Sequence, residues 1–176
     1  TAKLYMNGTL KASSSITSVN ATGTVPVSIG AYYTNQSYGF EGYISNVRIH
    51  QSALYSGSSF DVPTTVNREN ATLWAHYGNN ISSSFQNHGT PTYTGSPKHV
   101  PNSPVSQNAI TEAYTITDGG SAYFAGSGDH VDITDNNDLD FGTGDFTFEF
   151  WAYVLEGTSG NDGLISKGNS GTGWQI

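Results

Sequence analysis

Apolar and polar residues alternate with a period of two in several short stretches, which predicts β-strands. Residues 2–6 alternate in this way and run into Asn7-Gly8, the strongest short signal for a β-hairpin turn. Residues 9–12 are then the expected returning strand. Residues 25–30 form a further predicted strand, with a proline near its start.

The segment 40–50 is the clearest strand of the first half. Its alternation puts Tyr43, Val47 and Ile49 on one face, which we expect to pack in a core. Arg48 and His50 fall on the opposite face and are expected to point outward. Residues 51–69 follow as a predicted loop.

The second half contains several more predicted strands. Residues 71–77 form one, and residues 78–111 read as long loops with a short strand near 90–94. After short strands at 121–124 and 130–133, residues 146–154 carry aromatic side chains on both faces. Burial on both faces favours a central strand of a sandwich for this last segment.

Composition supports an all-β fold. Hydrophobic residues make up 35% of the 176 residues, charged residues only 11% and aromatic residues 12%. Small polar residues with abundant tyrosine and phenylalanine are typical of short strands joined by tight turns. The long Ala-, Leu-, Glu- and Lys-rich periodic stretches of a helical protein are missing. We therefore predict an all-β fold built as a sandwich of two sheets.

Charge and cysteine content exclude several classes of function. The formal net charge is −8, of which residues 112–176 carry −10 and residues 1–111 carry +2. A basic stripe for phosphate binding is absent, so nucleic acid is not an expected partner. The absence of cysteine excludes disulfides and thiolate chemistry. No apolar run reaches the length of a membrane-spanning helix.

Two parts of the sequence resemble a known family. Residues 120–131 (GSAYFAGSGDHV), followed by residues 139–151 (LDFGTGDFTFEFW), look like the opening of a laminin-G-like, concanavalin-A-like jelly roll. Residues 3–8 (KLYMNG) and 42–49 (GYISNVRI) resemble the closing part of the same domain. The resemblance implies an antiparallel jelly roll, similar to the tandem jelly-roll repeats of large surface adhesion and phage tail-fibre proteins.

The closing part comes first in the chain and the opening part second. One interpretation is a fragment of a tandem array, in which residues 1–66 are the C-terminal half of one domain and residues 70–176 the N-terminal portion of the next. The alternative is a circularly permuted single domain, in which residues 113–176 pair with residues 1–50 in one sandwich.

The acidic loops of the second half are candidates for calcium binding. Calcium takes six to eight oxygen ligands, and the resemblance implies that a structural calcium is possible. We name Asp129, Asp138, Asp140 and Asp145 as the candidate metal ligands. The other interpretation is that these aspartates only form turns between strands.

Three tyrosines in a polar loop are candidates for carbohydrate binding. Tyr32, Tyr33 and Tyr38 lie within the sequence AYYTNQSYG. A tyrosine ring offers a flat apolar face to a sugar, and neighbouring amides can bind the sugar hydroxyls. The other interpretation is that these rings pack against the core or a neighbouring domain.

These observations predict a non-catalytic lectin-like adhesion module, located outside the cell or on a virion surface. Glycans and neighbouring copies of the same domain are the expected partners. Hydrolysis of glycosides needs a pair of carboxylates. Glu149 is flanked on its own face by Thr147 and Trp151, so its strand does not carry such a pair and a glycosidase is not the expected function. The alternative function is a structural spacer or decoration domain that mediates protein–protein contacts in an assembly.

Overall fold

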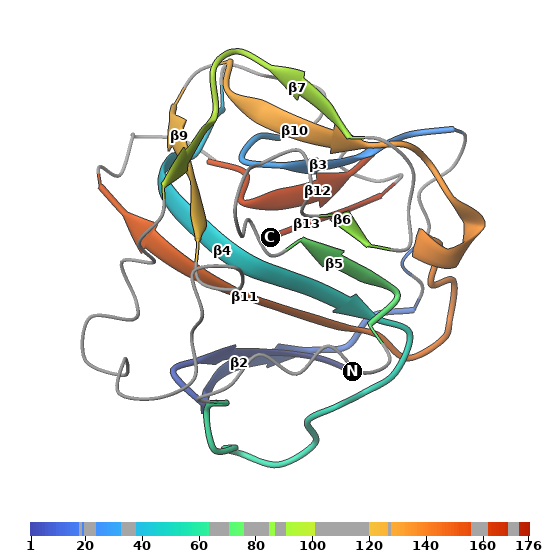
Figure 1. Cartoon of the computed structure of the whole chain (residues 1–176). Coiled ribbons are helices and arrows are strands. Elements are labelled where there is room, and N and C mark those ends of the chain that lie inside the picture. Colours follow the sequence, from blue (N-terminus) through green and yellow to red (C-terminus); the bar gives the residue numbers. More distant parts are fainter. Residues whose placement is uncertain are drawn as a thin grey trace.

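The chain forms a sandwich of two antiparallel sheets with a separate hairpin against one side (Figure 1). The computed structural model describes residues 1–17, 19, 24–32, 38–63, 71–75, 85–86, 91–100, 120–126, 128–155, 162–168 and 173–176. The strands are β1 (Ala2–Met6), β2 (Thr9–Ser14), β3 (Val27–Ile29), β4 (Glu41–His50), β5 (Leu73–Ala75), β6 (Phe85–Gln86), β7 (Thr92–Thr94), β8 (Lys98–Val100), β9 (Ser121–Ala125), β10 (His130–Ile133), β11 (Thr147–Val154), β12 (Ile165–Lys167) and β13 (Trp174–Gln175). A 3-10 turn, η2, spans Asn137–Leu139.

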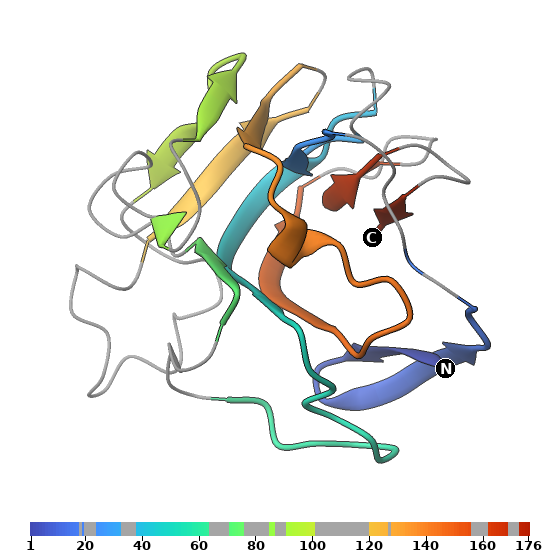
Figure 2. The same cartoon turned by 90° about the vertical axis from the view of Figure 1, so that its right-hand side faces the viewer.

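The two main sheets have five and six strands. The five-stranded sheet has the order β13-β12-β3-β10-β7. The other sheet has the order β6-β5-β4-β9-β8, and β11 pairs with β4 on its other side. Figure 2 shows the sheets edge-on, with the hairpin β1–β2 beneath them. This architecture confirms the predicted all-β antiparallel sandwich.

The core lies between the two main sheets. Its fully buried side chains come from β3, β10 and β12 on one side and from β4, β5 and β9 on the other. They include Val27, Ile29, Ile44, Val47, Ile49, Leu73, Phe124, Val131, Ile133 and Ile165. Phe146, Phe148 and Phe150 of the β11 segment pack against this core. Burial of this apolar surface is the main stabilising contribution to such a sandwich.

A β-bulge interrupts β4 at Asn46. Glu149 pairs with Arg48 and Trp151 pairs with Ser45, so Asn46 and Val47 together stand opposite Phe150. Asn46 has a positive φ of 51°, which asparagine tolerates better than most residues. Its side-chain oxygen accepts a hydrogen bond of 2.8 Å from the indole nitrogen of Trp74 on β5.

The bulge changes which side chains of β4 face the core. Val47 and Ile49 are buried in the core as predicted. On the other side of the bulge, Ile44 faces the core, opposite Ala122. Tyr43 therefore lies on the outer face of the sheet, and the prediction that it faces the core was wrong. The simple alternation of residues 40–50 does not hold because the bulge adds one residue to the strand.

β11 also differs from its prediction as a central strand. Within the described residues its only pairing is with β4. Its phenylalanines face the core, whereas Tyr153 on the opposite face is 52% exposed. Only one of the two aromatic faces of this segment is therefore packed in the core, and the other is partly exposed.

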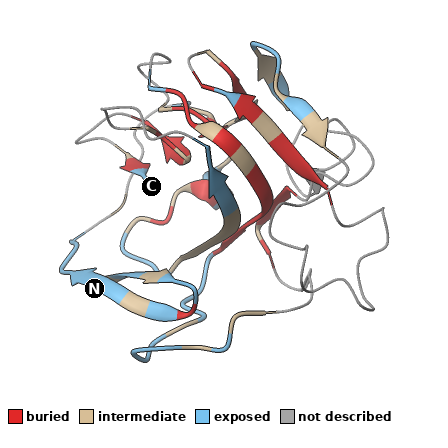
Figure 3. Cartoon of the chain, turned by 90° about the vertical axis from the view of Figure 1, so that its left-hand side faces the viewer, coloured by how far each residue is buried: buried red, intermediate tan, exposed pale blue. Residues whose placement is uncertain are grey.

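The hairpin β1–β2 and residues 51–60 cover one end of the outer face of the larger sheet. The amide of Leu10 donates to the carbonyl of Ser58, and the amide of Phe60 donates to the carbonyl of Gly8. The ring of Tyr5 contacts both Tyr55 and Phe60. Figure 3 shows that the hairpin itself is largely exposed, in contrast to the strands of the sandwich. Within the described residues, no helix is long and apolar enough to cross a membrane.

Strands from residues 1–66 and from residues 70–176 pair with each other in both main sheets. β4 pairs with β5, β9 and β11, and β3 pairs with β10 and β12. Within this chain the two ranges share one sandwich, which is the pairing that the circularly permuted alternative describes. Derivation from a tandem array concerns a longer polypeptide and stays a prediction.

Substitutions at Asn46 test the bulge. Asn46→Gly keeps a residue that accepts positive φ but removes the hydrogen bond to Trp74, and we expect it to lower the free energy of unfolding by about 1 kcal/mol. Asn46→Val adds the strain of a β-branched residue at positive φ and should cost about 2 kcal/mol more. Urea denaturation of both variants measures the difference. Equal stability of the two variants would contradict a bulge with positive φ at this residue.

Candidate functional site

Two of the three predicted carbohydrate-binding tyrosines, Tyr32 and Tyr38, are joined through their backbones. The amide of Tyr32 donates to the carbonyl of Tyr38 over 3.2 Å, and Ala31 and Gly39 form an isolated bridge. The amide of Gly163 also donates to the carbonyl of Tyr38. The Tyr38 side chain is 38% exposed. Tyr33 lies outside the described residues, so the structure places Tyr32 and Tyr38 near each other at the base of the predicted polar loop.

The first of the predicted metal ligands, Asp129, holds a turn together. One carboxylate oxygen accepts from the amide of Ser96 over 2.8 Å, and the other accepts from the amide of Ala125 over 3.0 Å. The residue is buried. Both oxygens of Asp129 therefore accept hydrogen bonds from the backbone. This agrees with the second interpretation of the aspartates, in which they form turns between strands.

The acidic loop after β10 is held by a lysine. Lys167 of β12 is fully buried, and its ammonium lies 2.9 Å from Asp135 and 2.5 Å from Asp140. A buried ammonium needs such carboxylate partners to offset its loss of hydration. Asp138 lies in η2, where its amide donates to the side chain of Asn136, and Asp145 is exposed.

The four predicted metal ligands do not fit a calcium site as they are placed. Within the described residues, no three or more histidine, aspartate or glutamate side chains are grouped so that they could hold a metal ion. The oxygens of Asp129 bind amides, and Asp140 binds the Lys167 ammonium. Calcium binding stays a sequence-based prediction.

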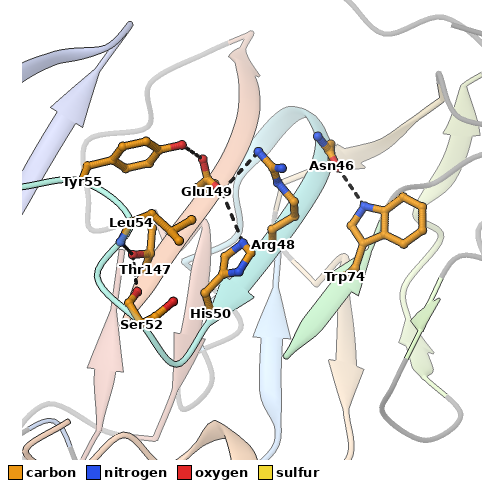
Figure 4. A network of polar contacts seen from close by, with 9 residues as sticks. All are labelled: Asn46, Arg48, His50, Ser52, Leu54, Tyr55, Trp74, Thr147 and Glu149. Atoms are coloured by element: carbon orange, nitrogen blue, oxygen red, sulfur yellow. Dashed lines mark hydrogen bonds and ion pairs between the residues drawn. The ribbon is translucent and has the colours of Figure 1, made fainter. Parts of the chain in front are cut away.

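A cluster of ionisable side chains surrounds Glu149 on the outer face of the larger sheet (Figure 4). One carboxylate oxygen lies 3.2 Å from the Arg48 guanidinium and 3.4 Å from the His50 imidazole. The other accepts a hydrogen bond from the Tyr55 hydroxyl. The side chains of Arg48 and His50 are nearly fully buried, at 7% and 4% exposed. Arg48 and His50 lie on the outer face of the sheet, as predicted, but both side chains are buried there and not exposed to solvent.

The environment of Glu149 shifts the pKa of two groups in this cluster. Burial acts to raise the pKa of the Glu149 carboxyl, but the hydrogen bonds from His50 and Tyr55 and the charge of Arg48 outweigh it, so the pKa is lowered. The pKa of the Tyr55 hydroxyl is raised, chiefly by burial and then by its hydrogen bond to Glu149. Both shifts keep Glu149 charged and Tyr55 neutral at physiological pH.

Residues 51–60, which we call the covering segment, pass over this cluster. Residues 52–54 attach this segment to β11 next to the cluster. The Thr147 hydroxyl donates to the carbonyl of Ser52 over 2.7 Å and accepts from the amide of Leu54 over 3.0 Å. The covering segment thus meets β11 through paired hydrogen bonds as well as through the Tyr55–Glu149 contact (Figure 4).

A second polar cluster crosses the outer face of the five-stranded sheet. The Ser28 hydroxyl donates to one carboxylate oxygen of Asp132, and the His130 imidazole lies 3.5 Å from the other. A serine, a histidine and an aspartate are the residue types of a catalytic triad, but their order in space is different here. In a triad the histidine lies between the serine and the acid, whereas here Asp132 lies between Ser28 and His130. The imidazole is therefore not placed to take a proton from the hydroxyl.

The pKa values of this second cluster follow from the same contacts. The hydrogen bond to Asp132 raises the pKa of His130, although burial opposes it. Burial acts to raise the pKa of Asp132, but the hydrogen bonds from His130 and Ser28 outweigh it and the pKa is lowered. The pair thus favours the charged form of both side chains.

Comparison with known proteins gives one match. Residues 1–57 match the laminin G family model of the concanavalin A-like lectin/glucanases superfamily. No curated protein and no solved structure matches the chain significantly. The match bears out the resemblance for residues 1–57, at the level of the superfamily. The matched residues include all three tyrosines that the sequence analysis named.

Several residues of these clusters were not predicted from the sequence. Lys167 gave no signal, because a single lysine on a short strand does not reveal which acids it meets. The sequence shows Glu149 only as a carboxylate flanked on its own face by Thr147 and Trp151. Arg48 and Glu149 lie about 100 positions apart, and their contact becomes visible only in the pairing of β4 with β11.

Removing the charge of Glu149 should destabilise the fold. Glu149→Gln leaves the buried Arg48 without its carboxylate, and we expect a loss of about 3 kcal/mol in the free energy of unfolding at pH 7. Tyr55→Phe keeps the ion pair and should cost about 1 kcal/mol. Because the pKa of Glu149 is lowered by folding, its contribution is complete above its ordinary pKa and is lost as the pH falls through the lowered value. Urea denaturation between pH 2 and pH 7, with the two variants compared, checks both points.

The contribution of His130 to the free energy of unfolding should decrease as the pH rises above neutral. Its pKa in the folded chain lies above the ordinary value of 6.5, so its contribution is fully present below 6.5 and is lost as the pH rises through the raised pKa. We expect the wild type to exceed His130→Gln in stability most clearly near pH 5.5, with the difference shrinking toward pH 9. Thermal unfolding of both proteins across this range measures it. A difference that grows with pH would contradict the ion pair with Asp132.

Proposed function

We propose that this chain is a non-catalytic, lectin-like module that binds carbohydrate and mediates adhesion as part of a cell-surface or virion fibre protein. The observation that carries the proposal is the exposed ring of Tyr38 at a loop whose ends are joined to each other. Rings held on a fixed backbone can stack on a sugar at a low cost in conformational entropy. The superfamily match, which includes lectins and covers this loop, supports the same function.

The superfamily name also includes glucanases, and the electrostatics of Glu149 argue against that activity. A glycosidase needs a carboxylic acid with a raised pKa to protonate the leaving group. The pKa of Glu149 is lowered, and its oxygens are engaged by Arg48, His50 and Tyr55. A carboxylate in this environment stabilises the sheet and is not available as a general acid.

An exposed apolar face favours a second candidate, a structural spacer or decoration domain. Leu4 and Met6 alternate on β1 and are 50% and 58% exposed. Exposed apolar side chains next to each other on a strand can contact another protein. In this alternative the module binds neighbouring copies in an assembly and no glycan.

Tyr38→Ala tests the carbohydrate proposal. We expect the wild-type chain to bind at least one member of a glycan array without cleaving it. Tyr38→Ala should weaken that binding about fivefold, because one aromatic contact contributes about 1 kcal/mol. Tyr38→Phe, which keeps the ring face, should bind like the wild type. Calorimetric titration with the glycan found on the array measures the affinities.

The same preparation separates the two candidates. A Leu4→Ser, Met6→Ser double variant is the control, since both side chains are exposed and the fold should tolerate the change. If the wild type binds no glycan but associates with itself, and the double variant remains monomeric in sedimentation velocity, the spacer function replaces the carbohydrate proposal.

A further inference from the structure

Three tyrosines and a lysine form one continuous row across four strands of the larger sheet. Tyr153 of β11 pairs with Tyr43 of β4, Tyr43 pairs with Tyr123 of β9, and Tyr123 pairs with Lys98 of β8. Directly paired residues point to the same face of a sheet. All four side chains therefore lie on the outer face, and we refer to them as the tyrosine row.

The rings of the tyrosine row are neighbours in space. The ring centres of Tyr43 and Tyr123 are 5.2 Å apart, and those of Tyr43 and Tyr153 are 6.4 Å apart. Adjacent planes are inclined by 43° and 56°, so the row is a twisted surface. The spacing follows from the distance between neighbouring strands, and the inclination accompanies the twist of the sheet.

Among the described residues, the row lies at the end of the outer face that is farther from residues 51–60. At the other end, residues 51–60 cover β4 and β11 near His50 and Thr147. At this end Tyr153 is 52% exposed, Tyr43 and Tyr123 are half-buried, and Lys98 is exposed. The bulge at Asn46 is what turns Tyr43 to this face.

The chemistry of the row suits a sugar chain. Each ring offers a flat apolar face for the C–H groups of a sugar ring, and each phenol can hydrogen bond to a hydroxyl. The spacing of the rings is close to the length of one unit in an extended saccharide chain. Lys98 ends the row with a donor, and Glu41, two residues before Tyr43 on the same face, adds an acceptor.

Charge favours a neutral ligand over a second copy of this chain. The net charge of −8 makes two copies repel each other, whereas it neither attracts nor repels an uncharged saccharide. The row also contains phenols and an ammonium group in place of the aliphatic side chains that dominate the core of the sandwich.

We infer that the tyrosine row binds an extended, neutral polysaccharide that runs across the strands, with successive sugar units on Tyr153, Tyr43 and Tyr123. The inference rests on the proposed carbohydrate-binding function, but it places an additional site away from the loop of Tyr32 and Tyr38. Binding at the row gains from chain length up to three units, because each of these units finds a further ring.

The test compares short and long oligosaccharides of one series. Cello-, xylo-, manno- and malto-oligosaccharides of two to six units are titrated calorimetrically against the wild type and three variants. The wild type should gain at least tenfold in affinity between two and six units for one series. Tyr153→Ala should lose most of this gain, and Tyr153→Phe should retain most of it, since the exposed residue contributes through its ring face.

Tyr38→Ala is the matched control, because it changes a partly exposed tyrosine at the other site. It should weaken binding at the loop and leave the gain in affinity with chain length at the row intact. Tyr123→Ala, with folding checked by circular dichroism, should reduce the gain as Tyr153→Ala does.

Two results would overturn the inference, and they can be told apart. If glycans bind and Tyr153→Ala keeps the full gain with chain length, the row is not a saccharide site, although the proposed function stands. If no saccharide binds the wild type, both fail. In that second case, self-association that is lost in Tyr153→Ala would assign the row to protein contacts.

Discussion

The full-length pairing of β4 with β11 is the constraint on which the rest of the structure depends. It joins residues 41–50 to residues 147–154, about 100 positions apart, and β4 in turn carries β5 and β9 on its other side. The core face of this pair holds Val47, Ile49 and Phe148. Its outer face holds the buried contact of Arg48 with Glu149 at one end and the tyrosine row at the other. A strand pair of such long sequence separation forms only with the whole sandwich, because its loop-closure cost is offset by the burial of both sheets.

The bulge at Asn46 lets this one strand serve two different faces. Without the extra residue, strict alternation would put Tyr43 on the same side as Val47 and Ile49. With it, Ile44 fills the core and Tyr43 joins Tyr123 and Tyr153 outside. Bulges that redirect side chains are frequent next to binding sites. The Trp74–Asn46 hydrogen bond fixes the side chain of the bulged residue, so the position of the row and the packing of the core are linked through one residue.

The polar clusters stabilise the sandwich and leave little free chemistry in the described residues. Glu149 is bound by three side chains, Asp132 by two, and Lys167 binds two aspartates. The lowered pKa values of Glu149 and Asp132 favour the charged carboxylates, which suits a structural role and does not suit a general acid. The aromatic surfaces then remain as the features that can meet a ligand without reacting with it. In the proposed function the module contributes contacts, and repetition in a longer chain would multiply them.

The sequence by itself determined the all-β class, most of the strands, the hairpin at Asn7-Gly8 and the resemblance that the match of residues 1–57 bears out. These follow from local patterns, since alternation and turn residues act over a few positions. Only the tertiary structure decided the partners: Glu149 with Arg48, Lys167 with Asp135 and Asp140, and the tyrosines of three strands in one row. It also reversed the expected face of Tyr43. Cross-strand neighbours are set by register, and one bulged residue shifts the register in a way that no local pattern reveals.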